Sequence, residues 1–235
     1  MQFGPGSVKE DEFLTRDECA RLVEKVCALQ QHWEPRFGPY GFSTLGCAAY
    51  LDYGDGTYTP KSRSLNPMML EAFGEVYERV RQYFNGILDA EAYYDESYSY
   101  PGFHLFEFQG DEGEGDNPAD RAHFDLQFTQ AFPDFEKQAL AMPLTFTLPL
   151  EEPSSGSSLE MWDVRPQDKD KLELGQAEYA RNNPSKTVHY AIGRMVTHDG
   201  LNLHAIGRIT PGAVGRRITL QGHAFKTPKG WLLYW

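Results

Sequence analysis

A histidine and an aspartate one residue apart are the feature of this 235-residue chain best suited to chemistry. His123 and Asp125 lie in the segment HFDLQF, whose alternating pattern predicts a β-strand. In a strand, residues i and i+2 point to the same face, so the imidazole and the carboxylate would project together. His204, far along the chain in the strand-like segment LNLHAIG, can supply a third ligand. Two histidines and one carboxylate can hold ferrous iron on one face and leave three coordination positions open.

Arg217 follows these residues, in the segment RRITLQGH. The order of His-x-Asp, a distant histidine and then Arg-x-Thr resembles the Fe(II)/2-oxoglutarate-dependent dioxygenase superfamily. The resemblance implies that His123, Asp125 and His204 hold Fe(II), and that Arg217 binds the distal carboxylate of the co-substrate 2-oxoglutarate. It also implies that Thr219 donates a hydrogen bond to that carboxylate. The reaction usual in the superfamily uses O2, releases succinate and carbon dioxide, and hydroxylates an unactivated C–H bond.

Three histidines compete for the third ligand position. The superfamily pattern, a glycine-led strand, a turn and then the histidine, fits GRMVTHDGLNLHAIG with His204 as the ligand. His198, beside the dipeptide Asp-Gly where a turn is expected, is the main alternative. His189 is interpreted as an ordinary strand residue. The competing interpretation of the whole motif is a surface hydrogen bond between His123 and Asp125 together with a core histidine.

The arginine also has rivals. Ile218 and Leu220 alternate with polar residues, and if these two side chains pack under helices, Arg217 faces a cavity. Arg216 points to the other face of the same strand, and Arg208 is a lesser alternative. A further possibility is that Arg217 pairs with an acidic residue at the rim.

The substrate pocket is less clearly marked. His104 lies on the strand before the motif and either faces the cavity or is a satisfied core residue. Trp231 and Trp235, at the end of the chain, could close the pocket or bury a dimer seam. The segments STLGCAAYLDY and RRITLQGH resemble fragments of small stand-alone hydroxylases and halogenases of free amino acids. Relatives that chlorinate carry Gly or Ala at the carboxylate position, so the intact Asp125 argues against halogenation.

Two helices are expected before the motif. The first lies in LTRDECARLVEKVCALQ, where Thr15 caps it and Glu18 completes a capping box. The second lies in SLNPMMLEAFGEVYERVRQYFNGIL, with Asn66 as the cap and Pro67 in the first turn. Its apolar, aromatic-rich stripe predicts packing on a sheet.

The rest of the chain favours strands. Two short strands are expected near residues 41–52, and SYSYPGFHLFEF reads as a strand kinked at its Pro-Gly. The acidic, glycine-rich segment 109–120 lacks EF-hand spacing and is expected to be a loop, a candidate lid over the metal. After the motif, strands are interrupted by a charged insertion of short helix and loop at 167–186.

This order of elements predicts a mainly β fold with N-terminal helices, a double-stranded β-helix or jelly-roll barrel of the kind that cupins also use. We expect one oxygenase domain over 1–235. Residues 1–95 would form its helical buttress and leading strands, and residues 96–235 its barrel core.

Net charge, apolar runs and cysteine spacing limit the partners and compartments expected for this protein. A net charge of −12 argues against binding nucleic acid or an anionic membrane surface. No apolar run reaches the length of a membrane span, and the N-terminus lacks the regions of a signal peptide. Three cysteines without zinc-site spacing are expected to be reduced thiols in a cytoplasmic protein. The oligomeric state is left open.

Three hypotheses follow. The first is a hydroxylase of a small soluble metabolite, such as a free amino acid or a natural-product intermediate. The second is a cupin-like metalloenzyme that does not use 2-oxoglutarate, since cupins favour three histidines and a glutamate and have no role for Arg217. The third is a non-catalytic binding barrel.

Overall fold

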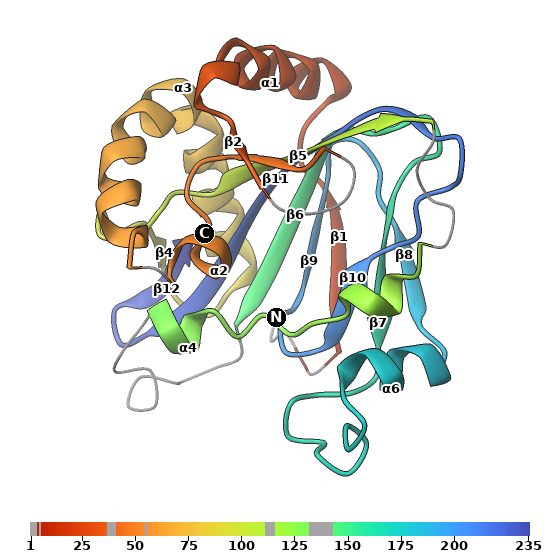
Figure 1. Ribbon diagram of the computed structural model, residues 1–235. Helices are drawn as coiled ribbons and strands as arrows, with labels where there is room; N and C mark the ends of the chain where they lie inside the picture. The colour runs from red at the N-terminus through yellow and green to blue at the C-terminus, as the bar shows by residue number, and fades with distance from the viewer. Residues whose placement is uncertain (1–3, 5, 37–40, 55, 111–115, 132–142) are drawn as a thin grey trace.

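A computed structural model describes residues 4, 6–36, 41–54, 56–110, 116–131 and 143–235. Among these residues, nine strands form a large sheet and three form a small one (Figure 1). In spatial order, the large sheet contains β1 (Val8–Glu12), β9 (Arg194–Asp199), β6 (Leu144–Glu151), β11 (Val214–Thr227), β5 (Gly102–Gln109), β3 (Ser43–Leu45) and β2 (Glu34–Pro35), with β12 (Gly230–Tyr234) beside β11 and β4 (Ala92–Tyr93) beside β12. The small sheet contains β10 (Leu203–Ile206), β7 (Ser158–Trp162) and β8 (Lys186–His189).

Neighbouring strands run antiparallel except β12 and β4, which are parallel. The two sheets face each other as the halves of a jelly roll (Figure 1). The predicted mainly β fold with N-terminal helices is therefore confirmed.

The main hydrophobic core lies between the large sheet and two helices, α1 (Arg16–Ala28) and α3 (Tyr58–Ile87), on the side away from the small sheet (Figure 1). Ile218 and Leu220 of β11 are fully buried in this core. Because side chains alternate along a strand, Arg217 must then point to the other face, into the space between the sheets. The predicted alternation of β11 is confirmed.

Helix α1 begins as predicted. The Thr15 hydroxyl accepts from the Glu18 backbone N–H, and the Glu18 carboxylate accepts from the Thr15 N–H at 2.7 Å. Cys19 is buried on the apolar side of this helix. All three cysteines are free thiols, as expected.

Helix α3 begins at Tyr58, earlier than predicted, and Pro67 lies inside it. Asn66 is not its cap: the buried amide donates to the Tyr98 carbonyl at 2.8 Å and accepts from the Tyr100 N–H at 3.2 Å. These bonds tie the helix to the segment before β5. Pro67 removes only one intrahelical hydrogen bond, which packing on the sheet outweighs.

The region 41–52 contains only one of the two expected strands. Strand β3 ends at Leu45. Gly46 follows with a φ of 109°, which favours glycine, and the chain continues into α2 (Ala49–Asp52). The Asp52 carboxylate accepts from the Ala48 N–H at 3.0 Å and so holds the start of this short helix. The expected kink before β5 coincides with the start of that strand at Gly102.

Two remaining helices lie near the small sheet and the motif. The predicted insertion contains α6 (Gln176–Asn182), and α4 (Phe128–Ala131) follows the motif. Short 3-10 helices cover Gln30–His32 and Pro118–Arg121. Of the candidate lid 109–120, residues 111–115 lie outside the described residues. None of the helices described is long and apolar enough to cross a membrane.

Candidate metal centre

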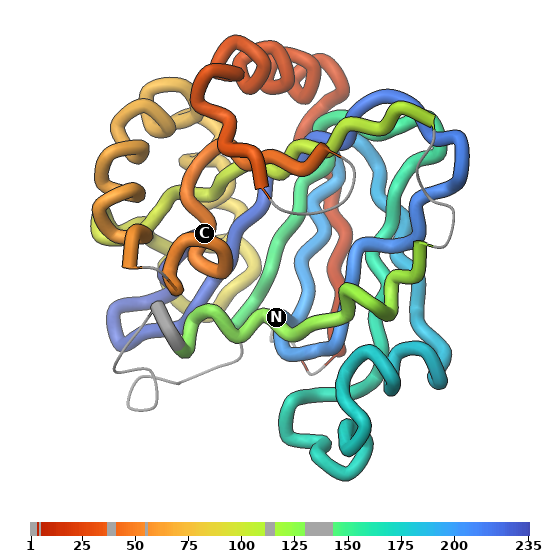
Figure 2. The backbone as a smooth tube through the Cα atoms, in the orientation of Figure 1, coloured from red at the N-terminus to blue at the C-terminus, as the bar shows by residue number. Residues whose placement is uncertain are grey.

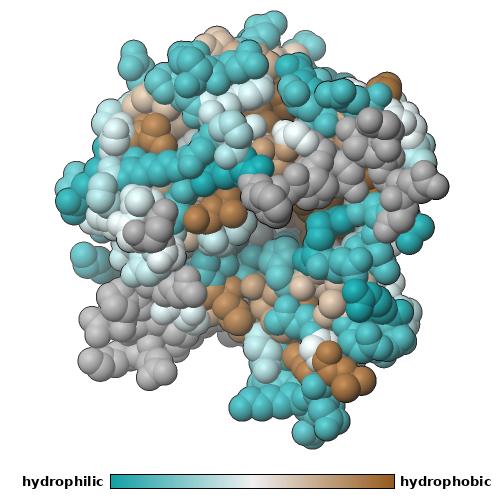
Figure 3. All heavy atoms as spheres, viewed as in Figure 1, coloured by the Kyte–Doolittle hydropathy of each residue, from teal (hydrophilic) through white to brown (hydrophobic). Residues whose placement is uncertain are grey.

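A cavity of about 650 Å³ lies between the two sheets. The face of the molecule viewed in Figure 3 is hollowed near its middle. The described lining residues come from both sheets, from α2 and from the segment after η2 (Pro118–Arg121). His123, Asp125, His204 and Arg217 all line this single space.

Backbone hydrogen bonds bring the first two ligand residues to the third. His123 and His204 form an isolated antiparallel bridge, with N–H to carbonyl distances of 2.9 and 3.0 Å in the two directions. The Asp125 N–H donates to the Gly200 carbonyl at 2.8 Å. Figure 2 shows this segment running beside the connection between β9 and β10. The predicted strand at the motif is therefore not regular: it is reduced to a single β-bridge. This bridge still directs the side chains of His123 and Asp125 to the same side, as the predicted strand would.

Gly200 permits this close approach. A Cβ added there would lie 3.0 Å from the Thr145 hydroxyl oxygen and 3.1 Å from the Asp125 Cβ. A larger residue would therefore push the connection away from the aspartate.

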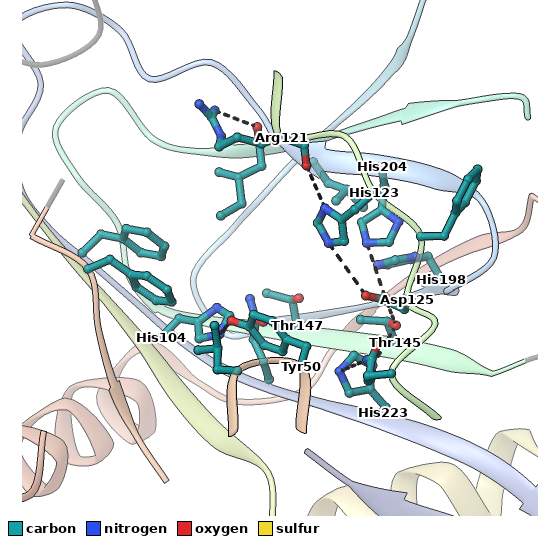
Figure 4. Close-up of a pocket in the computed structure, with 18 of the residues that line it drawn as sticks. Tyr50, His104, Arg121, His123, Asp125, Thr145, Thr147, His198, His204 and His223 are labelled. Carbon is teal, nitrogen blue, oxygen red and sulfur yellow. Dashed lines mark hydrogen bonds and ion pairs between the residues drawn. The ribbon is translucent and has the colours of Figure 1, made fainter. Parts of the chain in front are cut away.

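The donor atoms of His123, Asp125 and His204 all lie within 4.8 Å of one another (Figure 4). His204 Nε2 is 3.3 Å from Asp125 Oδ2, and His123 Nε2 is 3.8 Å from Asp125 Oδ1. This is the donor set of a two-histidine, one-carboxylate iron centre, with the remaining side of the group open to the cavity.

The protonation of both rings suits a metal. His123 Nδ1 donates to the Arg121 carbonyl at 2.8 Å, and His204 Nδ1 donates to the Asn202 carbonyl at 2.7 Å. A carbonyl only accepts, so Nδ1 carries the proton in each ring. The Nε2 lone pairs are then free to bind a cation, the arrangement found in metal-ligating histidines.

Asp125 is held by a chain of hydrogen bonds. Gln127 donates to His223 Nε2 at 2.8 Å, His223 Nδ1 donates to the Thr145 hydroxyl at 3.0 Å, and Thr145 donates to Asp125 Oδ2 in a short bond (Figure 4). Every proton in this chain points toward the carboxylate. These hydrogen bonds orient the Asp125 carboxylate.

Electrostatics agree with a cation site. Burial alone raises the pKa of Asp125, but His204, His223 and His123 outweigh it and hold that pKa well below its usual value. Burial lowers the pKa of His204, yet the Asp125 carboxylate outweighs burial and raises it. The carboxylate is therefore a permanent negative charge at the centre of the group.

His198 lies next to the group without belonging to it. Its ring centroid is 4.6 Å from that of His204 and nearly perpendicular to it, and it is buried on β9 rather than in a turn. Burial and the neighbouring His204 lower the pKa of His198 to about 3, so it is neutral. His189, at the exposed end of β8, does not line the cavity.

Arg217 is 1% exposed. Its Nε donates to the Ser157 hydroxyl at 3.1 Å, while Nη1 and Nη2 have no hydrogen-bond partner among the described residues. The aromatic rings of Phe106 and Tyr190 lie 5.5 and 5.3 Å from the guanidinium carbon. A buried guanidinium with two unused nitrogens fits a ligand carboxylate, because a planar two-pronged contact would satisfy both.

The rival arginines are placed elsewhere. Arg216, on the opposite face of β11, pairs with Glu151 at 2.9 Å. Arg208 is exposed and does not line the cavity. The Ser157 hydroxyl that accepts from Arg217 itself donates to the buried Glu152 carboxylate. Burial raises the pKa of Glu152 despite the opposing charge of Arg217.

Three further predicted site residues have mixed outcomes. His104 lines the cavity, where Tyr50 is its hydrogen-bond partner at 2.7 Å. Thr219 shares the cavity-facing side of β11 but does not line the cavity. Trp231 is a correction: it packs in the main core, and its indole N–H donates to Asp89 at 3.0 Å because β12 lies outside the cavity wall.

Sequence reasoning did not identify the residues that support the site. Thr145, Ser157 and Tyr190 lie in separate segments, and no spacing in the sequence connects them with Asp125 or Arg217. Glu152 lies in the same connection as Ser157, its hydrogen-bond partner. His223 carried a signal, because it lies on the same side of the RRITLQGH strand as Arg217.

The sequence matches no family model and no curated protein. The structure resembles that of an N-substituted L-amino acid dioxygenase from Burkholderia ambifaria AMMD, with a TM-score of 0.56 and 15% sequence identity over 97% of this chain and 85% of that one. The same dioxygenase in complex with alpha-KG gives a TM-score of 0.54. AviO1 from Streptomyces viridochromogenes Tue57 gives 0.51 at 14% identity, over 96% of this chain and 92% of that one. At these identities the likeness establishes a shared fold.

Proposed function

We propose that this protein is an Fe(II)- and 2-oxoglutarate-dependent oxygenase that hydroxylates an unactivated C–H bond of a small molecule. One observation carries the proposal above all: the buried guanidinium of Arg217, whose Nη1 and Nη2 have no partner in the described part of the chain, lines the same cavity as the three donor atoms of His123, Asp125 and His204. A metal site alone needs no such arginine. A dicarboxylate that chelates the metal with one end needs both groups: the metal for that end, and the guanidinium for the carboxylate at the other end.

The roles of the residues follow from the geometry. His123, Asp125 and His204 would hold the iron, and Arg217 would bind the far carboxylate of 2-oxoglutarate. When bound, iron and 2-oxoglutarate supply the chemistry by which dioxygen, 2-oxoglutarate and a substrate C–H become succinate, carbon dioxide and C–OH. The contact predicted between Thr219 and the same carboxylate stays a prediction.

The protein keeps the co-substrate end of the cavity dry. Phe106 and Tyr190 flank the guanidinium of Arg217 and exclude water from it. In such surroundings a charge-assisted hydrogen bond is stronger than in water. The intact Asp125 carboxylate favours hydroxylation over halogenation, because it occupies the position that a halide would need.

The two rival hypotheses fit the site less well. A cupin-like centre needs more nitrogen donors, whereas the ligand group found among the described residues contains two histidines and excludes His198. A non-catalytic barrel gives no reason for aligned donor atoms or for the backbone carbonyls that orient both ring nitrogens.

Binding of 2-oxoglutarate tests the proposal directly. Calorimetry on protein loaded anaerobically with iron should show 2-oxoglutarate binding that Arg217→Met weakens by about 10- to 100-fold, because a charge-assisted contact is lost. Iron binding should persist in Arg217→Met and be lost in His123→Ala.

Arg216→Met is the matched control, because this neighbouring arginine pairs with Glu151 outside the cavity. It should bind 2-oxoglutarate as the wild type does. If the wild type binds iron but no 2-oxoglutarate, the proposal fails and the cupin-like alternative gains. If it binds no stoichiometric iron, the non-catalytic barrel gains.

A further inference from the structure

One wall of the cavity is aromatic. Phe42 and Phe106 stack with ring centroids 4.6 Å apart and an angle of 8° between their planes. Phe108 continues the same row, with its centroid 6.5 Å from that of Phe106 and an angle of 16°. Ile206 and Ile209 pack against these rings and also line the cavity. Parallel rings beside apolar side chains form a surface on which a flat apolar group can stack.

A neutral polar pair, Tyr50 and His104, lies beside this wall (Figure 4). The Tyr50 hydroxyl and His104 Nε2 are 2.7 Å apart, and Phe42 contacts the His104 ring edge-on at 5.1 Å. Burial, followed by the nearby positive charge of Arg217, lowers the pKa of His104 well below its usual value. His104 is therefore uncharged.

The tautomer of His104 decides what Tyr50 offers to a ligand. His104 Nδ1 is buried, and no residue that the structure describes forms a hydrogen bond with it. Buried N–H groups without an acceptor are rarer than buried acceptors without a donor, so we assign the proton to Nε2. Nε2 then donates to the Tyr50 oxygen, and the Tyr50 O–H is left to donate into the cavity. Desolvation raises the pKa of Tyr50, although 45% of the residue remains exposed, so this hydroxyl keeps its proton.

The helix that carries Tyr50 is anchored to its neighbours. Tyr50 lies on α2, whose last residue, Asp52, is buried and makes a two-pronged ion pair with Arg36 at 2.9 and 2.8 Å. Lys61 of α3 also donates to Asp52 at 2.8 Å. These ion pairs hold α2, and the hydrogen bond with His104 orients the Tyr50 hydroxyl.

The charges that line the cavity are already engaged. Within the described part of the chain, the charged lining residues other than histidines are Arg121, Asp125 and Arg217. Arg121 pairs with Asp116 and donates to the Ile206 carbonyl, while the other two belong to the iron and 2-oxoglutarate sites. A zwitterionic amino acid would bring an ammonium and a carboxylate to a wall that offers neither a partner.

We propose that the substrate is an uncharged aromatic molecule that stacks on the Phe42–Phe106 wall and accepts a hydrogen bond from Tyr50. This inference rests on the proposed function and narrows it, since it disfavours the free amino acids that the sequence suggested.

A panel of probes that share an aromatic skeleton and carry a neutral, an anionic or a zwitterionic polar end tests the inference. Hydrocinnamamide, hydrocinnamate and L-phenylalanine share one skeleton as the neutral, anionic and zwitterionic form, and indole-acetamide, indole-acetate and L-tryptophan form a second series. Binding is measured by ligand-observed NMR at millimolar concentration, on full-length protein loaded with redox-inert zinc and saturated with 2-oxoglutarate. We expect the amides to bind and the charged forms to bind at least about tenfold more weakly, since burying an unpaired charge is costly.

Variants assign the binding to this wall. Tyr50→Phe should weaken amide binding about 3- to 10-fold by removing one hydrogen bond, and Phe42→Leu should weaken both series by removing the stacked ring. Tyr53→Phe, three residues away and outside the cavity lining, is the matched control and should bind like the wild type.

The outcomes separate the two proposals. If 2-oxoglutarate does not bind the zinc-loaded protein, the proposed function fails. If 2-oxoglutarate binds, the proposed function stands and the probes decide the inference about the substrate. That inference is overturned if the zwitterions bind best, if no amide binds, or if Tyr50→Phe binds the amides as tightly as Tyr53→Phe does.

Discussion

Thr145 orients the carboxylate of Asp125, although it is not itself one of the proposed metal ligands. The Thr145 hydroxyl donates to the oxygen of Asp125 that also lies 3.3 Å from His204 Nε2. Its own acceptor position is filled by His223, so the hydroxyl proton has one direction available. Partners of this kind raise the affinity of a metal site by fixing its ligands.

We therefore predict that Thr145→Val weakens metal binding by about 10- to 100-fold. Valine keeps the shape of the side chain but leaves Asp125 free to rotate. Thr147→Val, two residues along the same face of β6 and also in the cavity lining, is the control and should leave the metal affinity unchanged. Calorimetric titration of the metal-free protein with zinc measures both, and equal affinities in the two variants would contradict the role of Thr145.

Arg217 carries a stability cost in the ligand-free protein. A charged group with 1% exposure and two unpartnered nitrogens has lost its hydration without a full set of hydrogen bonds in return. Replacement of such a charge by an apolar side chain of similar size is often neutral or stabilising.

Arg217→Met should therefore leave the free energy of unfolding of the ligand-free protein unchanged or raise it by about 1–2 kcal/mol. Urea denaturation of the variant and the wild type measures this difference. A loss of several kcal/mol would mean that the guanidinium is a structural group rather than a ligand-binding one.

Among the elements, α1 shows the closest agreement between sequence and structure. Its capping box joins residues three apart, so local geometry alone determines it. The hydrogen bonds from Thr15, followed by that from Arg79, lower the pKa of Glu18 from its ordinary 4.5 to about 2. A depressed pKa means that the ionised carboxylate stabilises the folded state.

The sign of the pH dependence follows. The contribution of Glu18 is complete above pH 4.5 and disappears as the pH falls toward about 2, since both states are then protonated. Glu18→Gln should be less stable than the wild type at neutral pH, and the gap should narrow across that window. Thermal unfolding at several pH values measures it, with the exposed Glu24→Gln of the same helix as the control. A gap that is constant with pH would rule out the carboxylate as its cause.

The β9–β10 connection illustrates the opposite case. Gly200 accepts the Asp125 N–H, and His204, four residues later, pairs with His123. One turn thus receives the whole His-x-Asp segment. The sequence predicts that His204 joins this segment at a metal, but it does not indicate that backbone bonds to the turn hold them together. The expected strand at the motif is replaced by this bridge, because His123 and His204 exchange two backbone hydrogen bonds while Asp125 makes one, to Gly200.

In the whole molecule, the site joins parts of the chain that fold together only when both sheets are formed. A ligand that binds this assembled state and not the unfolded chain must stabilise it. At 100 times its Kd, such a ligand contributes about 2.7 kcal/mol, which corresponds to about 5–11 °C in Tm for a chain of this length.

We predict that zinc and 2-oxoglutarate, each at about 100 times its Kd, together raise the Tm by roughly twice that amount, because the contributions of the two ligands add when 2-oxoglutarate binds the zinc-loaded protein. His123→Ala should lose most of the effect, because the metal that chelates 2-oxoglutarate is no longer held. Differential scanning fluorimetry measures the shift. An equal shift in His123→Ala would place the binding outside this centre.

By itself, the sequence determined the elements that follow from local pattern. The alternation of β11, the capping box of α1 and the order of His123, Asp125, His204 and Arg217 can be read directly, since each depends on residue type and near neighbours. The role of Asn66 in α3 could not, because its buried amide, predicted to cap the helix, instead bonds to a segment 32 residues away. Trp231 was a candidate for the pocket because no residue near it in the sequence indicates that β12 lies outside the cavity wall.

Only the tertiary structure decided how these groups are held and what lies opposite them. Ser157 and Arg217 are 60 residues apart, Tyr50 and His104 54, and Thr145 and Asp125 20. Contacts over such separations form only when the sheets pack. No periodic pattern in the sequence predicts which hydroxyl or ring will make such a contact. Residue types therefore set which chemistry is available, whereas the packing of the two sheets sets where it takes place and which molecules can reach it.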